Sequence, residues 1–513
     1  MKLNPLFRAD FYKIGHVSQY HEDVRQVFST WTPRSSRVPG VDKVVNFGLT
    51  MFLKEYVIKA FNDDFFARPK REVVDEYRHV IGTTLFRTNV RTDHIEALHD
   101  YGRLPLTFYS LPEGVRVPLN TPPIIVKNTN PGPFFWVTNY IETLMSNVLW
   151  KPMTSATTAR RFREIFMKHA RRSGEKDFGF VDWQGHDFSY RGMSGDEDAM
   201  ASGLGHLLMF TGTDTIPAIL AAEHYYGAKL APGAPIIGGS VAATEHSVAC
   251  ASIAYEGELG LLRRLLTEVY PTGVLSFVSD TMDLWKVLTE YIPACKDILD
   301  VRDGKLVVRP DSGDPVKIMC GDRDMYSSWV LSEYPPAGGV LRLLAKAMGT
   351  HSRENGKPLI GKPHPIFLNT GAAIYGDSIS PERADEILTR CIDEIGLSPY
   401  NCVFGIGSYT YAYVTRDTYG FAMKATAYKN RAGEIVPIFK KPVTDDGGKF
   451  SHKGIVAVYD NGDGSEAEPD YVVRQNADES ELDNCAYQKV FEDGTLLIDP
   501  DFETIRKRAR AGI

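Results

Sequence analysis

Short strand-like runs that end in polar residues or glycines recur through the middle of this chain. Clear examples lie at residues 274–280, 306–313 and 402–407, where apolar β-prone residues are followed by Asp, Arg or Gly. In a barrel of parallel strands, the active site lies at the carboxyl ends of the strands. The pattern therefore predicts an enzyme whose reacting groups follow the strands directly.

From about residue 176 these runs alternate with polar loops and helical stretches. The helices are expected at residues 197–209, 217–226, 247–270, 283–292, 339–347 and 381–396. Alternation of this kind is typical of βα units around a parallel sheet or barrel. The flanks differ, with a long helical tract at residues 135–172, expected to break near Lys151 and Pro152, and mostly β-like segments after residue 417.

Composition argues against several classes of function. The chain of 513 residues is long enough for two or more domains. Its formal charge of −7 argues against nucleic acid as the main partner, because proteins that bind the phosphate backbone usually present a basic face. Neither a membrane span nor the apolar core of a secretory signal is visible. Six scattered cysteines without a CxxC pair favour the reducing cytoplasm.

The segment at residues 309–313 gives the clearest chemical signal. Arg309 can bind phosphate in bidentate fashion, and Asp311 can accept ribose hydroxyls or lie near Mg²⁺. The alternative is a salt-bridged turn. Its position at the end of a strand favours a functional role.

Other candidates are weaker when taken singly. A lone histidine such as His246 is more often structural, and the functional alternative is a phosphorylated nucleophile oriented by an acid. Asp214, between two threonines, is as well suited to cap a helix as to bind a substrate. Phe188 and Tyr12 could be core aromatics, and the glycines at residues 404–408 are weak evidence for phosphate binding.

Several common motifs are absent from the sequence. It has no Walker A motif, no GxGxxG between a strand and a helix, and no acidic pair followed by Thr-Gly. The sequence therefore does not indicate an NTPase, a dehydrogenase or a type I phosphoribosyltransferase.

Taken together, the motifs resemble those of the nicotinamide phosphoribosyltransferases, a type II phosphoribosyltransferase family. The resemblance runs almost from end to end and keeps the family's order. It rests on residues 10–16, 138–143, 186–192, 212–215, 245–247, 279–280, 309–313, 376–377, 415–417 and 424.

The resemblance implies an irregular parallel α/β barrel together with an α+β domain formed from both chain ends. The implied limits are residues 1–175 for the N-terminal part of the α+β domain, 176–416 for the catalytic barrel and 417–513 for the β-rich C-terminal part. It also implies a head-to-tail homodimer with two active sites at the subunit interface.

The implied site begins with the pyridine ring of nicotinamide. The ring would stack between Phe188 and Tyr12 of the partner subunit, while Asp214 holds the carboxamide and Arg309 helps to position it. The residues expected to contact the nucleotide, ribose or phosphates are Arg191, Asp311, Gly376, Asp377, Gly407, Ser408 and, from the other subunit, Arg416 and Lys424. His246, Asp280 and Asp311 would be catalytic, with ATP phosphorylating His246 and Mg²⁺ accompanying the phosphates.

Three positions depart from the family pattern. Ser189 stands where the family usually has glycine, and Ser408 and Tyr409 follow the second glycine of the glycine-rich loop. Ala422 replaces a serine two residues before Lys424. These changes are expected to narrow the phosphate site and to remove one hydroxyl donor.

The reaction predicted in this way is phosphoribosyl transfer to nicotinamide, which gives nicotinamide mononucleotide and pyrophosphate for NAD biosynthesis. The nearest alternative is a nicotinate phosphoribosyltransferase, whose carboxylate substrate would be repelled by Asp214. A non-catalytic binding or signalling protein on the same fold is the alternative from another class.

Overall fold

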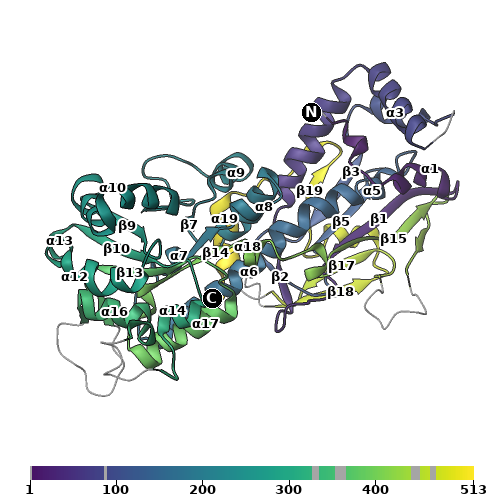
Figure 1. Cartoon of the computed structure of the whole chain (residues 1–513). Coiled ribbons are helices and arrows are strands. Elements are labelled where there is room, and N and C mark those ends of the chain that lie inside the picture. The colour runs from purple at the N-terminus through teal and green to yellow at the C-terminus, as the bar shows by residue number, and fades with distance from the viewer. Residues whose placement is uncertain (1–2, 86–88, 326–333, 353–365, 441–450, 463–468) are drawn as a thin grey trace. The chain divides into compact units, whose positions relative to one another are not determined.

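The computed structural model describes residues 3–85, 89–325, 334–352, 366–440, 451–462 and 469–513 (Figure 1). The chain forms two compact units. Unit 1 comprises Met1–Thr157, Leu220–Lys229 and Val414–Gly512, and unit 2 comprises Thr158–Ile219 and Leu230–Tyr413. These units are defined by compactness, and the expected domain limits after residues 175 and 416 stay a prediction.

Unit 2 is built around a seven-stranded sheet in which every pair of neighbouring strands is parallel. In spatial order the strands are β7 (Gly212–Thr213), β6 (Gly185–Phe188), β14 (Cys402–Gly407), β13 (Gly371–Tyr375), β10 (Gly304–Arg309), β9 (Gly273–Val278) and β8 (Ala242–Ala243). The apolar runs noted in the sequence form β9, β10 and β14. All carboxyl ends therefore lie at one end of the sheet.

The two edge strands of this sheet meet through a single bridge. Gly212 of β7 pairs in parallel with Gly239, three residues before β8. The N–H of Thr213 donates to the carbonyl of Gly239 at 2.9 Å, and the N–H of Gly239 donates to that of Thr211 at 2.9 Å. The sheet thus curves back on itself, and the predicted irregular α/β barrel is confirmed.

Helices pack along the outside of the barrel strands (Figure 1). They include α10 (His246–Arg264), α14 (Pro315–Cys320), α16 (Gly339–Met348) and α17 (Pro381–Arg390). Inside, alternate strand residues face one another, and Val307, Ala372 and Ile374 form a small buried cluster with Phe188 and Val403 against it. This follows from the two-residue side-chain period of a strand.

Unit 1 contains a seven-stranded antiparallel sheet that includes strands from both chain ends. Its order is β16 (Ile435–Pro437), β15 (Ala422–Asn430), β1 (Val24–Thr32), β5 (Ile124–Asn128), β3 (Leu106–Ser110), β19 (Gln488–Glu492) and β20 (Thr495–Leu496). The α+β class predicted for the chain ends is confirmed. The closing helix is α19 (Phe502–Arg510), as expected.

The long helical tract is less broken than the sequence predicts. Helix α6 (Glu142–Arg172) runs through Pro152, so the break expected there is wrong. Proline removes one backbone hydrogen bond and crowds the preceding turn. Here its ring packs against Gly48, where a Cβ would lie 2.6 Å from Cγ of Pro152. None of the described helices is both long and apolar enough to cross a membrane.

Candidate active site

Three neighbouring strands deliver His246, Asp280 and Asp311 to one end of the barrel. His246 begins α10 soon after β8, Asp280 follows β9, and Asp311 follows β10. Nε2 of His246 lies 3.7 Å from Oδ1 of Asp280 and 3.9 Å from Oδ2 of Asp311. The three groups named from the sequence as catalytic are therefore close together.

Two hydroxyls outside the predicted set of site residues complete this cluster. Nδ1 of His246 lies 3.2 Å from Oγ1 of Thr281, so a hydroxyl rather than an acid contacts this ring nitrogen. Ser312 donates its hydroxyl to Oδ2 of Asp280 at 2.6 Å, and the N–H of Asp311 donates to the same oxygen at 3.0 Å. Ser312 belongs to the motif at residues 309–313, whereas Thr281 was missed, although it directly follows the predicted Asp280.

The carboxylates of the cluster crowd one another. Burial raises the pKa of Asp311, Arg309 opposes this, and the charges of Asp280 and Asp377 reinforce it. The side chain of Asp280 is 7% exposed, and its Oδ1 is buried without a hydrogen-bond partner in the described part of the chain. Within the same residues, no group of three or more His, Cys, Asp or Glu side chains is arranged to hold a metal ion. The cluster therefore has acceptor capacity that the protein alone does not fill.

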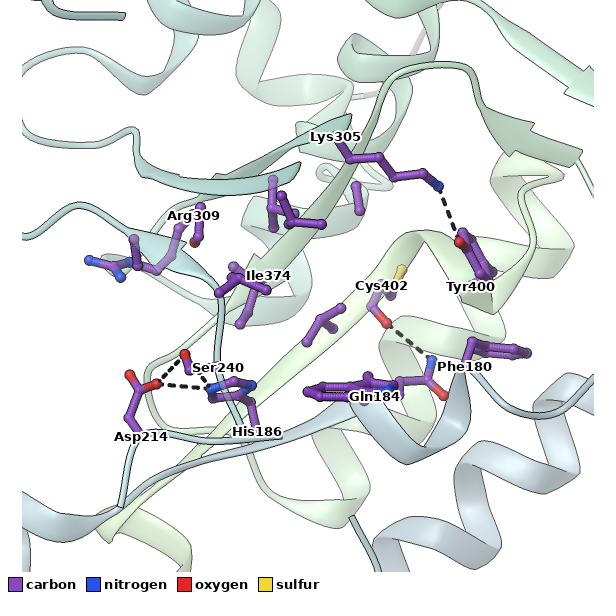
Figure 2. Close-up of a pocket in the computed structure, with 18 of the residues that line it drawn as sticks. Phe180, Gln184, His186, Asp214, Ser240, Lys305, Arg309, Ile374, Tyr400 and Cys402 are labelled. Atoms are coloured by element: carbon purple, nitrogen blue, oxygen red, sulfur yellow. Dashed lines mark hydrogen bonds and ion pairs between the residues drawn. The ribbon is translucent and has the colours of Figure 1, made fainter. Parts of the chain in front are cut away.

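A cavity of about 620 Å³ occupies the barrel interior next to these groups. Phe188, Asp214 and Arg309 line it at the carboxyl ends of the strands. At the other end Lys305 donates to the hydroxyl of Tyr400 at 3.3 Å (Figure 2). The volume and the mostly apolar walls suit a flat ring with a polar substituent.

Two glycines create the space in which the Phe188 ring lies. A Cβ at Gly405 of β14 would be 2.3 Å from Cδ2 of Phe188. A Cβ at Gly376 would be 3.1 Å from Cε2 of the same ring and 3.0 Å from Oδ1 of Asp311. Gly376 therefore allows an aromatic ring and a carboxylate to come close to the same backbone position.

Asp214 is held by two residues that were not assigned to the site from the sequence. Nε2 of His186 lies 3.0 Å from Oδ1 of Asp214, and the hydroxyl of Ser240 donates to the same oxygen at 2.6 Å. Figure 2 shows the three side chains pointing toward one another. His186 opens one of the motifs noted in the sequence, whereas nothing in the sequence marked Ser240.

The glycine-rich loop lies beside the segment that carries Arg191. Arg191 is exposed in the short helix η5 (Tyr190–Gly192), and Ser408 begins α18 (Ser408–Tyr411) directly after Gly407. A Cβ at Gly192 would lie 2.1 Å from Cβ of Ser408, so these two segments are in close contact. The structure thus places the segment that carries Arg191 next to Ser408, and their role in binding phosphate stays a prediction.

The remaining predicted residues belong to unit 1. Tyr12 and Arg416 line one hollow of about 270 Å³, together with Glu142. Glu142 forms ion pairs with the buried Lys13 and, at 3.3 Å, with Lys424. Of the three residues expected to act on another subunit's site, Lys424 thus pairs with Glu142, and Tyr12 and Arg416 line the same hollow as Glu142.

Comparisons with known proteins show the family of this chain. Residues 183–493 match the model of the nicotinate phosphoribosyltransferase (NAPRTase) family. The nicotinamide phosphoribosyltransferase of Acinetobacter baylyi is 43% identical over 99% of this chain and 97% of its own length. The protein of the same name from Mycoplasma pneumoniae is 30% identical over 89% of this chain and 97% of its own length. The chain belongs to the nicotinate phosphoribosyltransferase family.

As a member of the nicotinate phosphoribosyltransferase family, the chain is a phosphoribosyltransferase enzyme. A solved structure shares the fold of this chain. The crystal structure of nicotinate-nucleotide pyrophosphorylase from Pyrococcus furiosus aligns over 99% of this chain and 95% of that one, with a TM-score of 0.55 and 15% identity. At this identity the likeness shows the type II fold alone.

Proposed function

We propose that this enzyme transfers the phosphoribosyl group of 5-phosphoribosyl 1-pyrophosphate to nicotinamide. The products are nicotinamide mononucleotide and pyrophosphate, so the reaction would serve NAD biosynthesis. The observation that carries the proposal is Asp214, whose carboxylate faces the barrel cavity beside Phe188 and Arg309. The 43% identical relative supports the same reaction.

The charge of Asp214 is the basis for substrate choice. Burial raises the pKa of this carboxyl, but hydrogen bonds from His186 and Ser240 and the charge of Arg309 bring it below its ordinary value. Asp214 is therefore ionised at neutral pH. An ionised carboxylate accepts a hydrogen bond from a carboxamide NH₂ and repels the carboxylate of nicotinate.

Transfer breaks the bond between the anomeric carbon and pyrophosphate and forms a bond from that carbon to the pyridine nitrogen. Charge develops on the sugar ring and on the leaving pyrophosphate, so catalysis requires positioning and charge stabilisation rather than a covalent protein–sugar bond. Phe188 would orient the pyridine ring, and Arg191 with Ser408 would hold phosphate. Asp311 and Asp377 would hold the ribose.

Mg²⁺ fits the carboxylate cluster when it brings phosphate oxygens with it. Mg²⁺ is usually bound by one or two carboxylates together with substrate phosphates. The unpartnered Oδ1 of Asp280 and the crowded Asp311 provide such carboxylates. When bound, the ion would neutralise charge on the leaving pyrophosphate.

ATP would stimulate the reaction through His246. The imidazole is a competent nucleophile toward a γ-phosphate near neutral pH. Its Nε2 faces Asp280 and Asp311, and a proton on Nδ1 can be donated to Oγ1 of Thr281. Transfer of the γ-phosphoryl group to Nε2 would release ADP and place about two negative charges beside the pyrophosphate region.

The active enzyme would be a homodimer that shares its sites. Tyr12 is 61% exposed, as a residue that stacks on another subunit's substrate must be in the single chain. Unit 2 also exposes large apolar side chains close to the site in sequence, among them Val248 of α10 (58%) and Met282 (63%). An interface would remove such residues from water.

Product analysis tests the proposal directly. The enzyme and its Asp214→Asn variant would each receive nicotinamide or nicotinate with 5-phosphoribosyl 1-pyrophosphate and Mg²⁺, with and without ATP. We expect the unmodified enzyme to prefer nicotinamide strongly. Asp214→Asn should narrow the preference, because an amide both donates and accepts. Equal use of both rings by the unmodified enzyme would identify it as a nicotinate enzyme or an unselective one, and no product would favour a binding protein.

A further inference from the structure

Two donors, one on strand β6 and one beside the bridge that closes the barrel, converge on one oxygen of Asp214. His186 lies on β6, and Ser240 directly follows the residue that bridges to β7. Both reach Oδ1 of Asp214, at 3.0 Å and 2.6 Å. The side chain of His186 is 9% exposed, whereas that of Asp214 is 49% exposed and lines the cavity. One oxygen is thus held by the protein while the carboxylate remains open to a ligand.

The chemistry of the acceptor fixes the hydrogens. A carboxylate oxygen only accepts, so Nε2 of His186 carries the hydrogen and the hydroxyl of Ser240 turns its hydrogen to Oδ1. These two bonds use both lone pairs of Oδ1. Oδ2 accepts no hydrogen bond from any residue that the structure describes. It is the oxygen left for a donor on the substrate.

We infer that His186 and Ser240 are positioning residues that set the enzyme's choice between a carboxamide and a carboxylate substrate. They do so by holding Asp214 in its ionised form with one oxygen free. This inference rests on the proposed function. Without the two donors Asp214 would protonate more readily, and a carboxylic acid can donate to nicotinate.

The barrel closure explains why these residues meet. Ser240 is brought to Asp214 by the bridge between Gly212 and Gly239. A Cβ at Gly212 would lie 2.7 Å from Nδ1 of His186 and 2.9 Å from the carbonyl of Gly185. Glycine at this position therefore lets the imidazole of His186 come close to β7.

Replacing His186 by glutamine or by asparagine tests its hydrogen bond to Asp214 separately from the space that its side chain fills. The amide nitrogen of glutamine reaches about the position of Nε2, whereas that of asparagine lies near Nδ1 and stops short of Asp214. Ser240→Ala removes the second donor. Thr267→Ala is the matched control, because among the residues that the structure describes the Thr267 hydroxyl bonds only to the carbonyl of Arg263, four residues earlier.

The full-length enzyme and each variant would be assayed for kcat and KM with nicotinamide and with nicotinate. Hydrogen bonds to charged groups are strong enough that His186→Asn should change the preference by about tenfold or more. The quantity that falls is kcat/KM for nicotinamide divided by kcat/KM for nicotinate. The change should come from a higher KM for nicotinamide and a lower KM for nicotinate. His186→Gln should keep most of the preference, Ser240→Ala should lose part of it, and Thr267→Ala should match the unmodified enzyme.

The pH profile gives a readout that a packing role would not change. Ionised Asp214 accepts the carboxamide NH₂ more strongly than the protonated acid does, so kcat/KM for nicotinamide falls as pH drops through its pKa. The groups that lower this pKa are His186 on β6, Ser240 before β8 and Arg309 at the end of β10. His186→Asn should therefore move the acid limb to higher pH, and His186→Gln should move it less.

The inference is overturned if folded His186→Asn keeps both the preference and the acid limb, or if His186→Gln behaves like His186→Asn. Equilibrium binding of nicotinamide and nicotinate measures the same preference without turnover. If the unmodified enzyme makes no nicotinamide mononucleotide, the proposed function fails. If His186→Asn still binds nicotinamide in preference to nicotinate, this inference alone is overturned.

Discussion

The surroundings of His246 follow from the parallel strands, because their carboxyl ends lie at the same end of the barrel. Its ring lies among Thr281, Asp280 and Asp311, which come from the next two strands of the barrel. Transfer of the phosphoribosyl group itself needs no phosphohistidine. The proposed role of His246 is thus separable from the transfer reaction.

We expect His246→Ala to abolish ATP hydrolysis and to reduce the stimulation by ATP to about onefold, while slow ATP-independent synthesis remains. ATPase turnover and mononucleotide formation would be measured on the same preparation. An exposed histidine of α3 (Lys70–Thr84), replaced in His79→Ala, is the control. Stimulation that persists in His246→Ala would show that the histidine is structural.

The sequence was sufficient to find residues that directly follow a strand. It was not sufficient to find residues whose role depends on a contact between neighbouring strands. Asp280 and Asp311 were predictable because each directly follows an apolar run. Ser240 follows no such run, and its role depends on a bridge between two glycines. His186 was visible in a motif, but its contact with Asp214 requires the pairing of β6 with β7. Such contacts depend on tertiary closure, which local pattern does not encode.

At the scale of elements, the long β-strands and helices of unit 2 were predictable, and the shortest strands were not. Strands β7 and β8 have two residues each, too few for a periodic pattern. The break predicted in α6 is wrong for a different reason: the helix continues through Pro152, whose ring lies against Gly48, far away in the sequence. Local propensity therefore predicts that the fold is an α/β barrel. The bridge that closes the barrel and the continuity of α6 depend instead on residues distant in sequence.

Strand β14 offers a test of how one element shapes the substrate site. Gly405→Ala would put a methyl group 2.3 Å from Cδ2 of Phe188 and 2.7 Å from Cα of Gly376. The ring must move, so we expect KM for nicotinamide to rise roughly tenfold, within the ~1–3 kcal/mol typical of overpacking. Steady-state kinetics and the thermal midpoint would be measured together.

The control for this variant is Gly260→Ala, whose methyl group would make ordinary contacts at 3.4 Å with Glu256 in α10. Its KM should stay unchanged. An unchanged KM in Gly405→Ala would mean that Phe188 does not stack on the substrate ring.

At the scale of the whole molecule, the predicted site residues divide between the two units. Asp214 and Phe188 lie in unit 2, and Tyr12 and Arg416 lie in unit 1. If the unit 1 residues serve the other subunit, Tyr12→Ala and Asp214→Ala proteins should each be inactive and should complement each other. Equal mixing makes half of the dimers mixed, each with one intact site, so about a quarter of the activity should return.

The matched control mixes Asp214→Ala with Arg309→Ala. Both changes lie in unit 2, so every site of the mixed dimer is damaged and no activity should return. Recovery in neither mixture, with subunit exchange shown by mass-tagged chains, would mean that each site is built from one chain.

The pairing of β1 with β15 has a consequence for how the protein is made. Thr32 pairs with Ala422, so one edge of β1 has no partner until nearly the whole chain has left the ribosome. At roughly 5–20 residues per second this takes tens of seconds. During that time β1, with eight of its nine residues destined for burial, presents a bare strand edge. The barrel segment, which lies between β1 and β15 in the sequence, is translated before β15. The sheet that contains β1 is therefore completed only after the barrel segment has been made.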